Sequence, residues 1–427
     1  MKQLVVAMVL VCALAASCFA QGTTGAAPGE TLNPTLCGTA SPPAWCSGLD
    51  LGAWINAAGT SCSWACTVKV PAGVFTESTT VRIPLNTDGK FILEADGTFI
   101  LFKGSGYFVD TYETGVNPSG AQVDIRGFKV TGTESSPGAV RLLPSGDAMV
   151  EDNLFTGFAK GDGVTLAGAN TAAIRNNVVT YGLNGVRLYG NNCLKTAPYT
   201  CSPTLRGTVS GYAPNANTIS ENGFASLTGK GIVEDESLGF RTQNLNNRYL
   251  GNSLESDATG IQLVAADAAT IAYNYFEGNV HNIVVGNGCC NNRGTVIRDN
   301  YFTIGGQAPN TIELVTSIGA VVVGNLEFGS GSHCFENSTT VLDDYFGPNS
   351  VSSAHAYCTD GSAGNASTDV VVDGGNPIRT GGSTVPVVSG TQRAGQLVCI
   401  KKAPTATAPA IYGSCAAVSG AMCLVCN

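Results

Sequence analysis

An asparagine recurs along this chain at nearly even steps, each time inside the same short frame. The frame is an apolar residue, two variable residues, the Asn, one more residue, and then a bulky apolar residue. Its clear copies centre on Asn153, Asn177, Asn222, Asn274 and Asn300. Asn325 lies in a weaker copy because Glu327 replaces the bulky residue, and Asn247 with Tyr249 forms a looser one. The steps between successive Asn are 24, 45, 25, 27, 26 and 25 residues. A period in the twenties predicts a protein built of stacked coils.

A second marker lies between the Asn frames. It is a short apolar-x-apolar segment, usually opened by Gly, and its copies span residues 138–142, 163–166, 185–188, 260–263, 282–285 and 311–314. This alternation predicts strands with the outer two side chains inward and the middle one outward. Stacking such repeats places like residues above like at the inter-strand spacing of roughly 4.8 Å. The pattern therefore predicts an all-β parallel β-helix, and the 45-residue step predicts one coil with an insertion at residues 190–214.

The recurring Asn has a structural interpretation. At a tight corner Asn tolerates unusual backbone angles, and amides stacked in register can bond from coil to coil. We therefore expect a structural ladder of Asn rather than ligand contacts. We also expect the Phe and Tyr two residues later to stack in the core rather than on a sugar.

Charge excludes one class of partner. Formal net charge is −9, or −10 once Lys2 is removed with a leader (21 basic minus 31 acidic residues), and no basic tract is present. Nucleic acid is therefore not expected as a partner. An acidic polysaccharide would meet net repulsion unless cations or a local basic strip intervene.

The first twenty residues have the pattern of a secretory leader. Lys2 precedes the apolar stretch 4–16, and small residues lead to a cleavage site after Ala20. We expect a secreted protein, extracellular or periplasmic; a lipoprotein acylated at Cys18 is the competing interpretation. No later segment is apolar enough to be expected to cross a membrane.

The cysteines predict disulfides. Fourteen of the sixteen lie after the leader, an even number in an exported chain. The clustered ones are Cys37, Cys46, Cys62, Cys66, Cys193, Cys201, Cys334, Cys358, Cys399, Cys415, Cys423 and Cys426. Adjacent Cys289 and Cys290 are expected to bond elsewhere. Zinc is the competing interpretation of the terminal cluster, but that cluster contains no His.

Residues 49–58 and 68–75 resemble the start of the pectate-lyase-like right-handed β-helix superfamily. A short amphipathic segment, Leu49 to Ala58, precedes a strand that ends in Pro71-Ala72-Gly73-Val74-Phe75, and residues 80–84 and 123–132 also match. The resemblance covers roughly residues 49–345 and implies a single-stranded right-handed parallel β-helix with an N-terminal cap. It also implies a scaffold that faces carbohydrate. The superfamily's catalytic patterns are missing, and none of His281, His333 and His355 is flanked by Gly on both sides, so the reaction stays open.

These observations divide the chain into five segments. We expect a signal peptide at 1–20, a Cys- and Pro-rich lead-in at 21–48, the β-helix at 49–345, an irregular Gly/Ser-rich segment at 346–395, and a small Cys-rich C-terminal hairpin module at 396–427. A unit of that last size would depend on its disulfides.

The outward middle positions of the second strand are the first candidates for a site. In coil order they are Arg141, Thr165, Arg187, Val233, Gln262, Val284 and Glu313. Arg187 is a candidate catalytic residue, and Arg141, Gln262 and Glu313 are candidate substrate-binding residues. Arg141 and Arg187, two coils or roughly 10 Å apart, could neutralise a uronate carboxylate. The competing interpretation is exposed Arg on a solvated strand.

The densest acidic segment, Glu234-Asp235-Glu236, supplies further catalytic candidates. Glu234 falls at an inward position, where a carboxylate costs several kcal/mol unless it is paired or protonated. We therefore expect a slipped register or, preferably, a solvated acidic loop. Asp257, Asp267 and Glu277 could complete an acidic patch or a Ca²⁺ site. The expected cofactor is none, or Ca²⁺ if the protein is a lyase.

Three functions remain open. The first is polysaccharide cleavage by lyase or hydrolase chemistry, on a glycan that could contain uronic acid. The others are a non-catalytic carbohydrate-binding or adhesin-like protein and a structural envelope protein. The enzyme class predicts a groove walled by residues 190–214 and 234–258, with one carboxylate of 234–236 within reach of an outward basic residue. The binding class predicts a smooth side with exposed aromatics.

Overall fold

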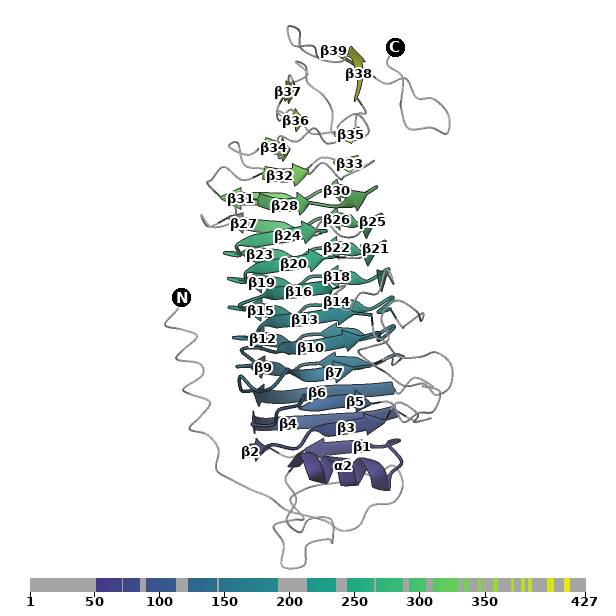
Figure 1. The fold of residues 1–427 in the computed structure, drawn as a ribbon, viewed down its shortest axis with the longest axis vertical. Coiled ribbons are helices and arrows are strands. Elements are labelled where there is room, and N and C mark those ends of the chain that lie inside the picture. The colour runs from purple at the N-terminus through teal and green to yellow at the C-terminus, as the bar shows by residue number, and fades with distance from the viewer. Residues whose placement is uncertain are drawn as a thin grey trace, which may run out of the picture.

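A computed structural model of the chain shows an elongated stack of coils (Figure 1). It describes residues 51–70, 72–84, 90–112, 122–143, 146–190, 213–235, 244–264, 266–286, 292–304 and 310–329, together with Asn349 and short strands between residues 334 and 414. Residues 1–50, for which the leader and the disulfides of Cys37 and Cys46 were predicted, lie outside these ranges, as do residues 190–214 in large part. No helix among the described residues has the length and apolar character needed to cross a bilayer.

Parallel strands build the stack, and within the described ranges they form two large sheets and one small sheet. Each coil crosses the 20-stranded sheet A twice, in a first and a second arm, and the 13-stranded sheet B once. The four-stranded sheet C lies at a further corner. Successive strands pair in parallel and in register, one coil above the next. The all-β right-handed parallel β-helix expected from the sequence is confirmed.

The strands have the following bounds. The first arm of sheet A contains β1 (Thr67–Val70), β8 (Met149–Glu151), β11 (Ala173–Arg175), β14 (Thr218–Ser220), β18 (Arg248–Leu250), β22 (Thr270–Ala272), β26 (Val296–Arg298), β30 (Val321–Val323), β33 (Tyr345–Phe346) and β35 (Val370–Val371). Its second arm contains β2 (Gly73–Glu77), β9 (Leu154–Thr156), β12 (Val178–Thr180), β15 (Gly223–Ala225), β19 (Ser253–Glu255), β23 (Tyr275–Glu277), β27 (Tyr301–Ile304) and β31 (Leu326–Gly329). The long strands β4 (Lys90–Phe102) and β6 (Gln122–Thr131) run through both arms.

Sheet B contains β3 (Val81–Pro84), β5 (Val109–Tyr112), β7 (Gly138–Leu142), β10 (Asp162–Ala167), β13 (Asn184–Tyr189), β16 (Lys230–Asp235), β20 (Thr259–Leu263), β24 (His281–Val285), β28 (Asn310–Leu314), β32 (Cys334–Asn337), β34 (Ala356–Thr359), β36 (Ile378–Thr380) and β37 (Ser383–Val385). Sheet C contains β17 (Asn244–Leu245), β21 (Ala266–Asp267), β25 (Asn292–Arg293) and β29 (Ser317–Ile318). Parallel pairing continues past residue 345, where the β-helix was expected to end, because β33 pairs with β35 and β32 with β34. The antiparallel pair β38 (Val398–Lys402) and β39 (Ile411–Ser414) forms the expected C-terminal hairpin.

A ladder of buried Asn side chains joins the coils at the corner between the two arms of sheet A. Its members are Asn153, Asn177, Asn222, Asn252, Asn274, Asn300, Asn325 and Asn349. Each side-chain amide donates to the Oδ1 of the next Asn at 2.9–3.0 Å. The backbone N–H of each donates to the same oxygen at 2.9–3.1 Å. The structural role expected for Asn is therefore confirmed, and Asn177 and Asn222 are neighbours despite the 45-residue step.

Two details of the expected frame are corrected. The copy assigned to Asn247 belongs to a different corner, where Asn217 donates to Asn247. The true copy is Tyr249 to Asn252 with Leu254, because Tyr249 is the Cα partner of Ile219 and Leu254 that of Phe224. The left-handed residue of each corner is also not the Asn. It is the residue before, with φ between 53° and 68° from Asp152 to Gly324.

The core consists of apolar ladders on the inward faces of these strands. Phe155, Val179, Phe224, Leu254, Phe276 and Phe302 follow one another in register and are buried. The Phe276 and Phe302 rings stack with centroids 4.8 Å apart. The expected stacked aromatic core is confirmed, and Glu327 takes the next inward position, as its place in the frame predicts.

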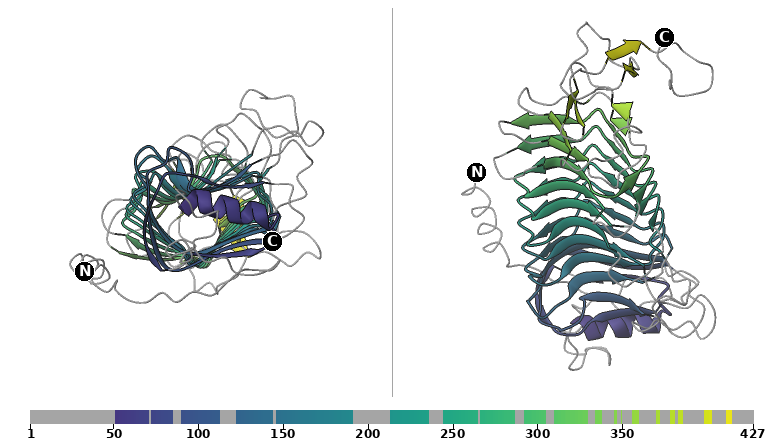
Figure 2. Two further views of the ribbon diagram at one scale, coloured as in Figure 1. Left: turned by 90° about the horizontal axis from the view of Figure 1, so that it is seen from below. Right: turned by 45° about the horizontal axis from the view of Figure 1, so that its top comes forward.

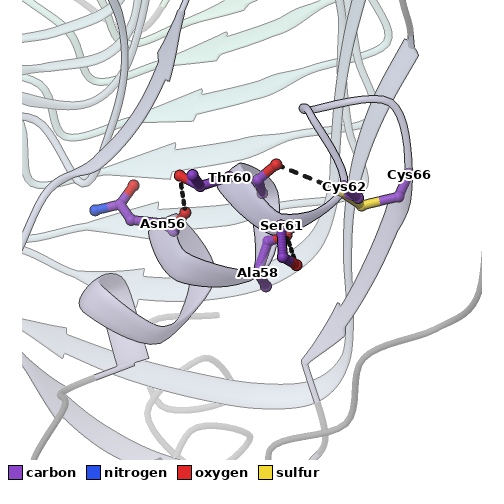
Figure 3. Close-up of a disulfide and its surroundings, with 7 residues drawn as sticks. Asn56, Ala58, Thr60, Ser61, Cys62 and Cys66 are labelled. Carbon is purple, nitrogen blue, oxygen red and sulfur yellow. Dashed lines mark hydrogen bonds between the residues drawn. A yellow bond between two sulfur atoms is a disulfide. The ribbon is translucent and has the colours of Figure 1, made fainter. Parts of the chain in front are cut away.

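Helix α2 (Leu51–Ser61) lies across the N-terminal end of the stack and buries Trp54 and Ile55 (Figures 1 and 2). It is the expected cap, and it covers strand edges that would otherwise pair with another chain. The Cys62–Cys66 disulfide closes the turn that follows the helix (Figure 3), as expected. Within that turn Trp64 packs edge-on against Phe91, with centroids 4.9 Å apart. The side chains of the remaining predicted cysteines lie outside the described part of the chain.

Replacement of a central ladder residue tests this account. Asn274→Ala removes the acceptor of the Asn252 backbone and side-chain N–H groups and the donor to Tyr249 O. Leaving buried donors unsatisfied should lower the free energy of unfolding by about 3 kcal/mol, measured by chemical denaturation. The matched control is Asn176→Gly at an exposed left-handed position, where a change within about 0.5 kcal/mol is expected. An equal change in the free energy of unfolding for the two variants would contradict a stabilising role for the Asn ladder.

Candidate functional site

The outward stripe of sheet B has the register that the sequence predicts. Arg141, Thr165, Arg187, Val233, Gln262, Val284 and Glu313 are Cα partners on successive strands from β7 to β28. Its side chains are not equally accessible, because Thr165, Val233 and Val284 are buried. The stripe therefore divides into an N-terminal polar group around the two arginines and a C-terminal group around Glu313.

Arg141 is held from two sides. Its Nε and Nη2 donate to the two carboxylate oxygens of Asp110, each at 2.7 Å, and Asp110 is its Cα partner on β5. The guanidinium also lies over the Tyr107 ring, 5.0 Å from its centroid. A bidentate, stacked guanidinium has little freedom to reorient.

A chain of polar contacts runs from Tyr107 towards the sheet. The Tyr107 hydroxyl lies 3.3 Å from Thr165 Oγ1, which donates to Asp162 Oδ2 at 2.9 Å. Asn184 Nδ2 donates to the other Asp162 oxygen at 2.8 Å. Burial raises the pKa of Tyr107, which keeps the phenol protonated, and burial also raises the pKa of the Asp162 carboxyl.

Arg187 pairs with Asp235 one coil further on. Its Nη2 and Nε donate to Asp235 Oδ2 at 2.6 and 3.2 Å, and its guanidinium lies 5.2 Å from the centroid of the Tyr189 ring. About a quarter of the side chain of each partner remains exposed, 29% for Arg187 and 25% for Asp235. The enzyme class predicted such a contact between a carboxylate of 234–236 and an outward basic residue, and the contact is present.

Together these residues form one surface, which we call the arginine–tyrosine cluster: Tyr107, Asp110, Arg141, Asp162, Thr165, Arg187, Tyr189 and Asp235. It offers cationic groups that can hold an anionic substrate, a protonated phenol that can act as an acid, and a partly exposed carboxylate that can act as a base. The side chains come from five adjacent parts of the chain between β5 and β16, so the in-register stacking alone brings them together.

Glu234 corrects the expectation of a solvated acidic loop. The register does not slip, because Glu234 is the Cα partner of Leu188 and of Leu263, and the side chain is fully buried inside the coil. It therefore cannot contact a sugar on the outer surface. Of its neighbours, Asp235 faces outward and Glu236 lies outside the described residues.

Donors from the next coil satisfy the buried carboxyl. Asn247 Nδ2 donates to Glu234 Oε1 at 3.0 Å, Asn244 Nδ2 approaches Oε2 at 3.3 Å, and the Tyr249 hydroxyl also donates to Oε1. The Asn217–Asn247 ladder would continue at position 269, which is Ala. Glu234 supplies the acceptor that this Ala cannot, and burial raises its pKa to about 7. Its role is structural.

The three acidic residues predicted to bind Ca²⁺ do not converge. Asp257 is buried at a corner, Asp267 lies on β21 beside Arg293, and Glu277 ends β23. The described ranges contain no group of three or more His, Cys, Asp or Glu side chains that could hold a metal ion. Asp257 Oδ1 instead accepts the Leu227 N–H at 2.9 Å, as Asn279 Oδ1 accepts the Asp257 N–H one coil later.

The remaining predicted binding residues lie in the C-terminal half of sheet B. Gln262 is half-buried on β20. Glu313 Oε1 lies 2.6 Å from Nδ1 of His281, the His on β24. This pair is three to four strands beyond Arg187, or roughly 15–20 Å along the axis at the usual strand spacing. Neither residue therefore contacts the arginine–tyrosine cluster.

Sequence reasoning missed Tyr107, Asp110, Asp162 and Tyr189. Asp110 lies in the outward row of Arg141 and could have been found by extending the stripe one strand towards the N-terminus. Asp162 and Tyr189 flank strands that the repeat identifies, but outside its middle position. Tyr107 precedes β5 in a segment that carries no periodic signal.

Burial of Glu234 predicts a pH-dependent stability. Because its folded pKa of about 7 is above the ordinary value, the wild-type contribution is fully present below about pH 4.3 and is lost as the pH rises through 7. Glu234→Gln should remove a decline of roughly 3 kcal/mol in the free energy of unfolding between pH 4 and 8. Denaturant titrations of both proteins across this range measure the difference. Parallel curves would show that Glu234 does not titrate this way.

Asp257→Asn should stabilise the protein at neutral pH. Asp257 Oδ2 is buried and makes no hydrogen bond, and burial raises the carboxyl pKa to about 7. At the matching position one coil later, Asn279 Nδ2 donates to Leu254 O, and an Asn at 257 can donate in the same way. We expect the free energy of unfolding to rise by about 1 kcal/mol at pH 8 and by less at pH 4. Chemical denaturation at the two pH values measures both changes. A loss at pH 8 would contradict the assigned corner role.

Comparison with known proteins gives similarity in fold but not in sequence. No family model matches the chain, and comparison with the sequences of curated proteins gives no match. Among solved structures, an alginate lyase from Paenibacillus sp. str. FPU-7 has a TM-score of 0.50 at 13% identity over 66% of this chain and 95% of the lyase. PfbA, a surface adhesin of Streptococcus pneumoniae, has a TM-score of 0.50 at 14% identity over 81% of this chain and 89% of the adhesin. At these identities the similarity shows the fold alone, which is the β-helix that the resemblance to the pectate-lyase-like superfamily implies.

Proposed function

We propose that the protein is exported and that its arginine–tyrosine cluster binds an acidic polysaccharide and cleaves it by β-elimination. The observation that carries the proposal is the contact between Arg187 and Asp235 on the outer face of sheet B, in the same cluster as the Tyr107 hydroxyl held by Thr165. Elimination next to a uronate requires a cationic group at the carboxylate, a base at the C5 proton and an acid at the leaving oxygen. The cluster contains one candidate for each.

Arg187 is the candidate for binding the uronate carboxylate of the substrate. This binding breaks the Arg187–Asp235 ion pair. When the uronate carboxylate takes the guanidinium, Asp235 loses its ion-pair partner, and its carboxylate is released to act as the base. Asp235 then accepts the C5 proton. The electron pair forms the C4–C5 double bond, and the C4–O4 bond breaks.

Tyr107 is the candidate for the acid. Its phenol gives a proton to the departing O4 and regains one from solvent, while Thr165 and Asp162 fix the position of the hydroxyl. The Asp110–Arg141 pair positions the Tyr107 ring from below. Because guanidinium groups neutralise the substrate carboxylate, we propose that the reaction needs no Ca²⁺.

A non-catalytic carbohydrate-binding role is the second candidate. Exposed aromatic side chains along sheet A favour it, since Phe328 on β31 is 66% exposed and Tyr273, at the corner between the two arms, is 57% exposed. The same assay separates the two functions, because binding without products would assign the protein to this class.

The test is incubation of the purified protein with alginate, polygalacturonate and neutral glucans, with and without EDTA. We expect unsaturated products, detected by their ultraviolet absorbance, from a uronate polymer only, and equal rates with EDTA. Tyr107→Phe and Asp235→Asn should each lower kcat by about 10²–10⁴-fold. Arg298→Ala, on β26 of sheet A and three coils beyond the last cluster strand, is the control and should keep the wild-type rate.

Other outcomes replace the proposal in defined ways. New reducing ends without unsaturated products would replace elimination by hydrolysis. Loss of activity in EDTA, restored by Ca²⁺, would contradict the role given to the arginines. Full activity of both Tyr107→Phe and Asp235→Asn would show that the reaction takes place at another part of the molecule.

A further inference from the structure

A second surface lies on the outer face of the second arm of sheet A. We call it the tyrosine face, and its members are the outward side chains of β19, β23, β27 and β31: Ser253, Glu255, Tyr275, Glu277, Tyr301, Thr303, Leu326 and Phe328. Leu326 is 43% and Phe328 66% exposed. None of these outward residues is basic, so this face differs in charge from the arginine–tyrosine cluster.

Two tyrosine rings stack at its centre. Tyr275 and Tyr301 are Cα partners, and their rings lie 5.7 Å apart between centroids at 11° between planes. On the other side of Tyr275 the partner is Ser253. A serine side chain is too short to cover an aromatic ring, so one face of Tyr275 remains open to a ligand.

Two carboxylates lie beside this ring face, two residues further along β19 and β23. Glu255 and Glu277 are Cα partners on adjacent coils. Glu255 Oε1 accepts the Ser253 hydroxyl at 2.8 Å, and Glu277 Oε2 accepts the Tyr275 hydroxyl at 2.7 Å. The first hydrogen bond holds the Glu255 carboxylate at Ser253, and the second holds the Glu277 carboxylate at the Tyr275 hydroxyl.

The charge of this pair is not balanced by neighbouring side chains. In the part of the chain that the structure describes, neither Glu255 nor Glu277 forms an ion pair, although like charges on facing positions destabilise a sheet. On the first arm of the same sheet the acids are paired, Glu94 with Lys69 and Arg126, and Glu151 with Arg175. An aromatic face beside two unbalanced carboxylates is suited to a cation that also carries an apolar surface.

We propose that the tyrosine face binds an amino-sugar polymer through its protonated amines. One sugar ring stacks by its C–H face on the open side of Tyr275, and its ammonium group lies between Glu255 and Glu277. The chain continues along the axis over Tyr301 towards Phe328, with the Thr303 hydroxyl as a further polar contact. A polyuronate would be repelled by the two carboxylates. The proposal shares no residue with the arginine–tyrosine cluster and does not depend on the reaction proposed there.

The test measures binding of a β-1,4-linked glucosamine hexamer by titration calorimetry at about pH 5.5 and at low salt, which limits the screening of charges. The N-acetylated hexamer, cellohexaose and hexalysine are the comparison ligands. We expect the glucosamine hexamer to bind at least tenfold more tightly than the two uncharged sugars. Its affinity should fall as salt rises, because screening weakens charge contacts.

Variants assign the binding to the face. Glu255→Gln and Glu277→Gln should each lower the affinity for the glucosamine hexamer about tenfold. Tyr275→Ala should lower this affinity at least as much. In the free protein Glu277→Gln should not lower the Tm, because it relieves repulsion, so lost binding cannot be attributed to unfolding. Matched controls are Glu221→Gln and Tyr181→Gly, exposed residues at corners with φ of 58° and 54°, and both should bind as the wild type does.

Three results would overturn the proposal. Equal affinity for cellohexaose would remove the role of the amine. Binding of hexalysine without binding of the sugar would replace the glycan by a basic peptide. Wild-type affinity in both Gln variants would place the ligand elsewhere.

Discussion

The Asn ladder is the interaction on which the rest of the structure depends. Every ladder amide donates to the Asn of the next coil and also to a backbone carbonyl, as Asn274 does to Asn300 and to Tyr249. A buried amide without those partners would be costly. The ladder therefore fixes which residue of one coil lies above which residue of the next, and a shift of one residue would turn every side chain to the wrong face.

This constraint also governs the exceptions in the core. Glu234 occupies an inward position in a row otherwise filled by Leu and Val between Leu142 and Leu314. The register holds because Asn244, Asn247 and Tyr249 supply donors. Tyr249 takes the place that Ile occupies in the coils on both sides. The buried acid and the larger Tyr thus form one compensated substitution spread over two coils, which no single-position reading of the repeat reveals.

The outer faces follow the same geometry with different consequences. Outward positions need not satisfy the core, so each sheet can carry its own chemistry on the same scaffold. Sheet B holds paired arginines and aspartates beside half-buried phenols, the arrangement behind the proposed cleavage of an acidic glycan. The second arm of sheet A holds stacked tyrosines and unbalanced glutamates, and the first arm holds an alternating row of ion pairs from Lys69 to Arg175.

The sequence alone determined the fold, because a period in the twenties and an Asn corner are local signals repeated many times. It also placed the outward stripe from Arg141 to Glu313, since alternation within a strand sets direction. The sequence could not show to which corner of the coil Asn247 belongs, because two corners contain Asn and spacing alone does not distinguish them. Only the tertiary structure decided that Glu234 is buried and that Tyr107, Asp110 and Asp162 meet the two arginines. The reason is that stacking brings residues 31 to 58 positions apart into contact, and those contacts depend on side-chain reach and burial rather than on the repeat.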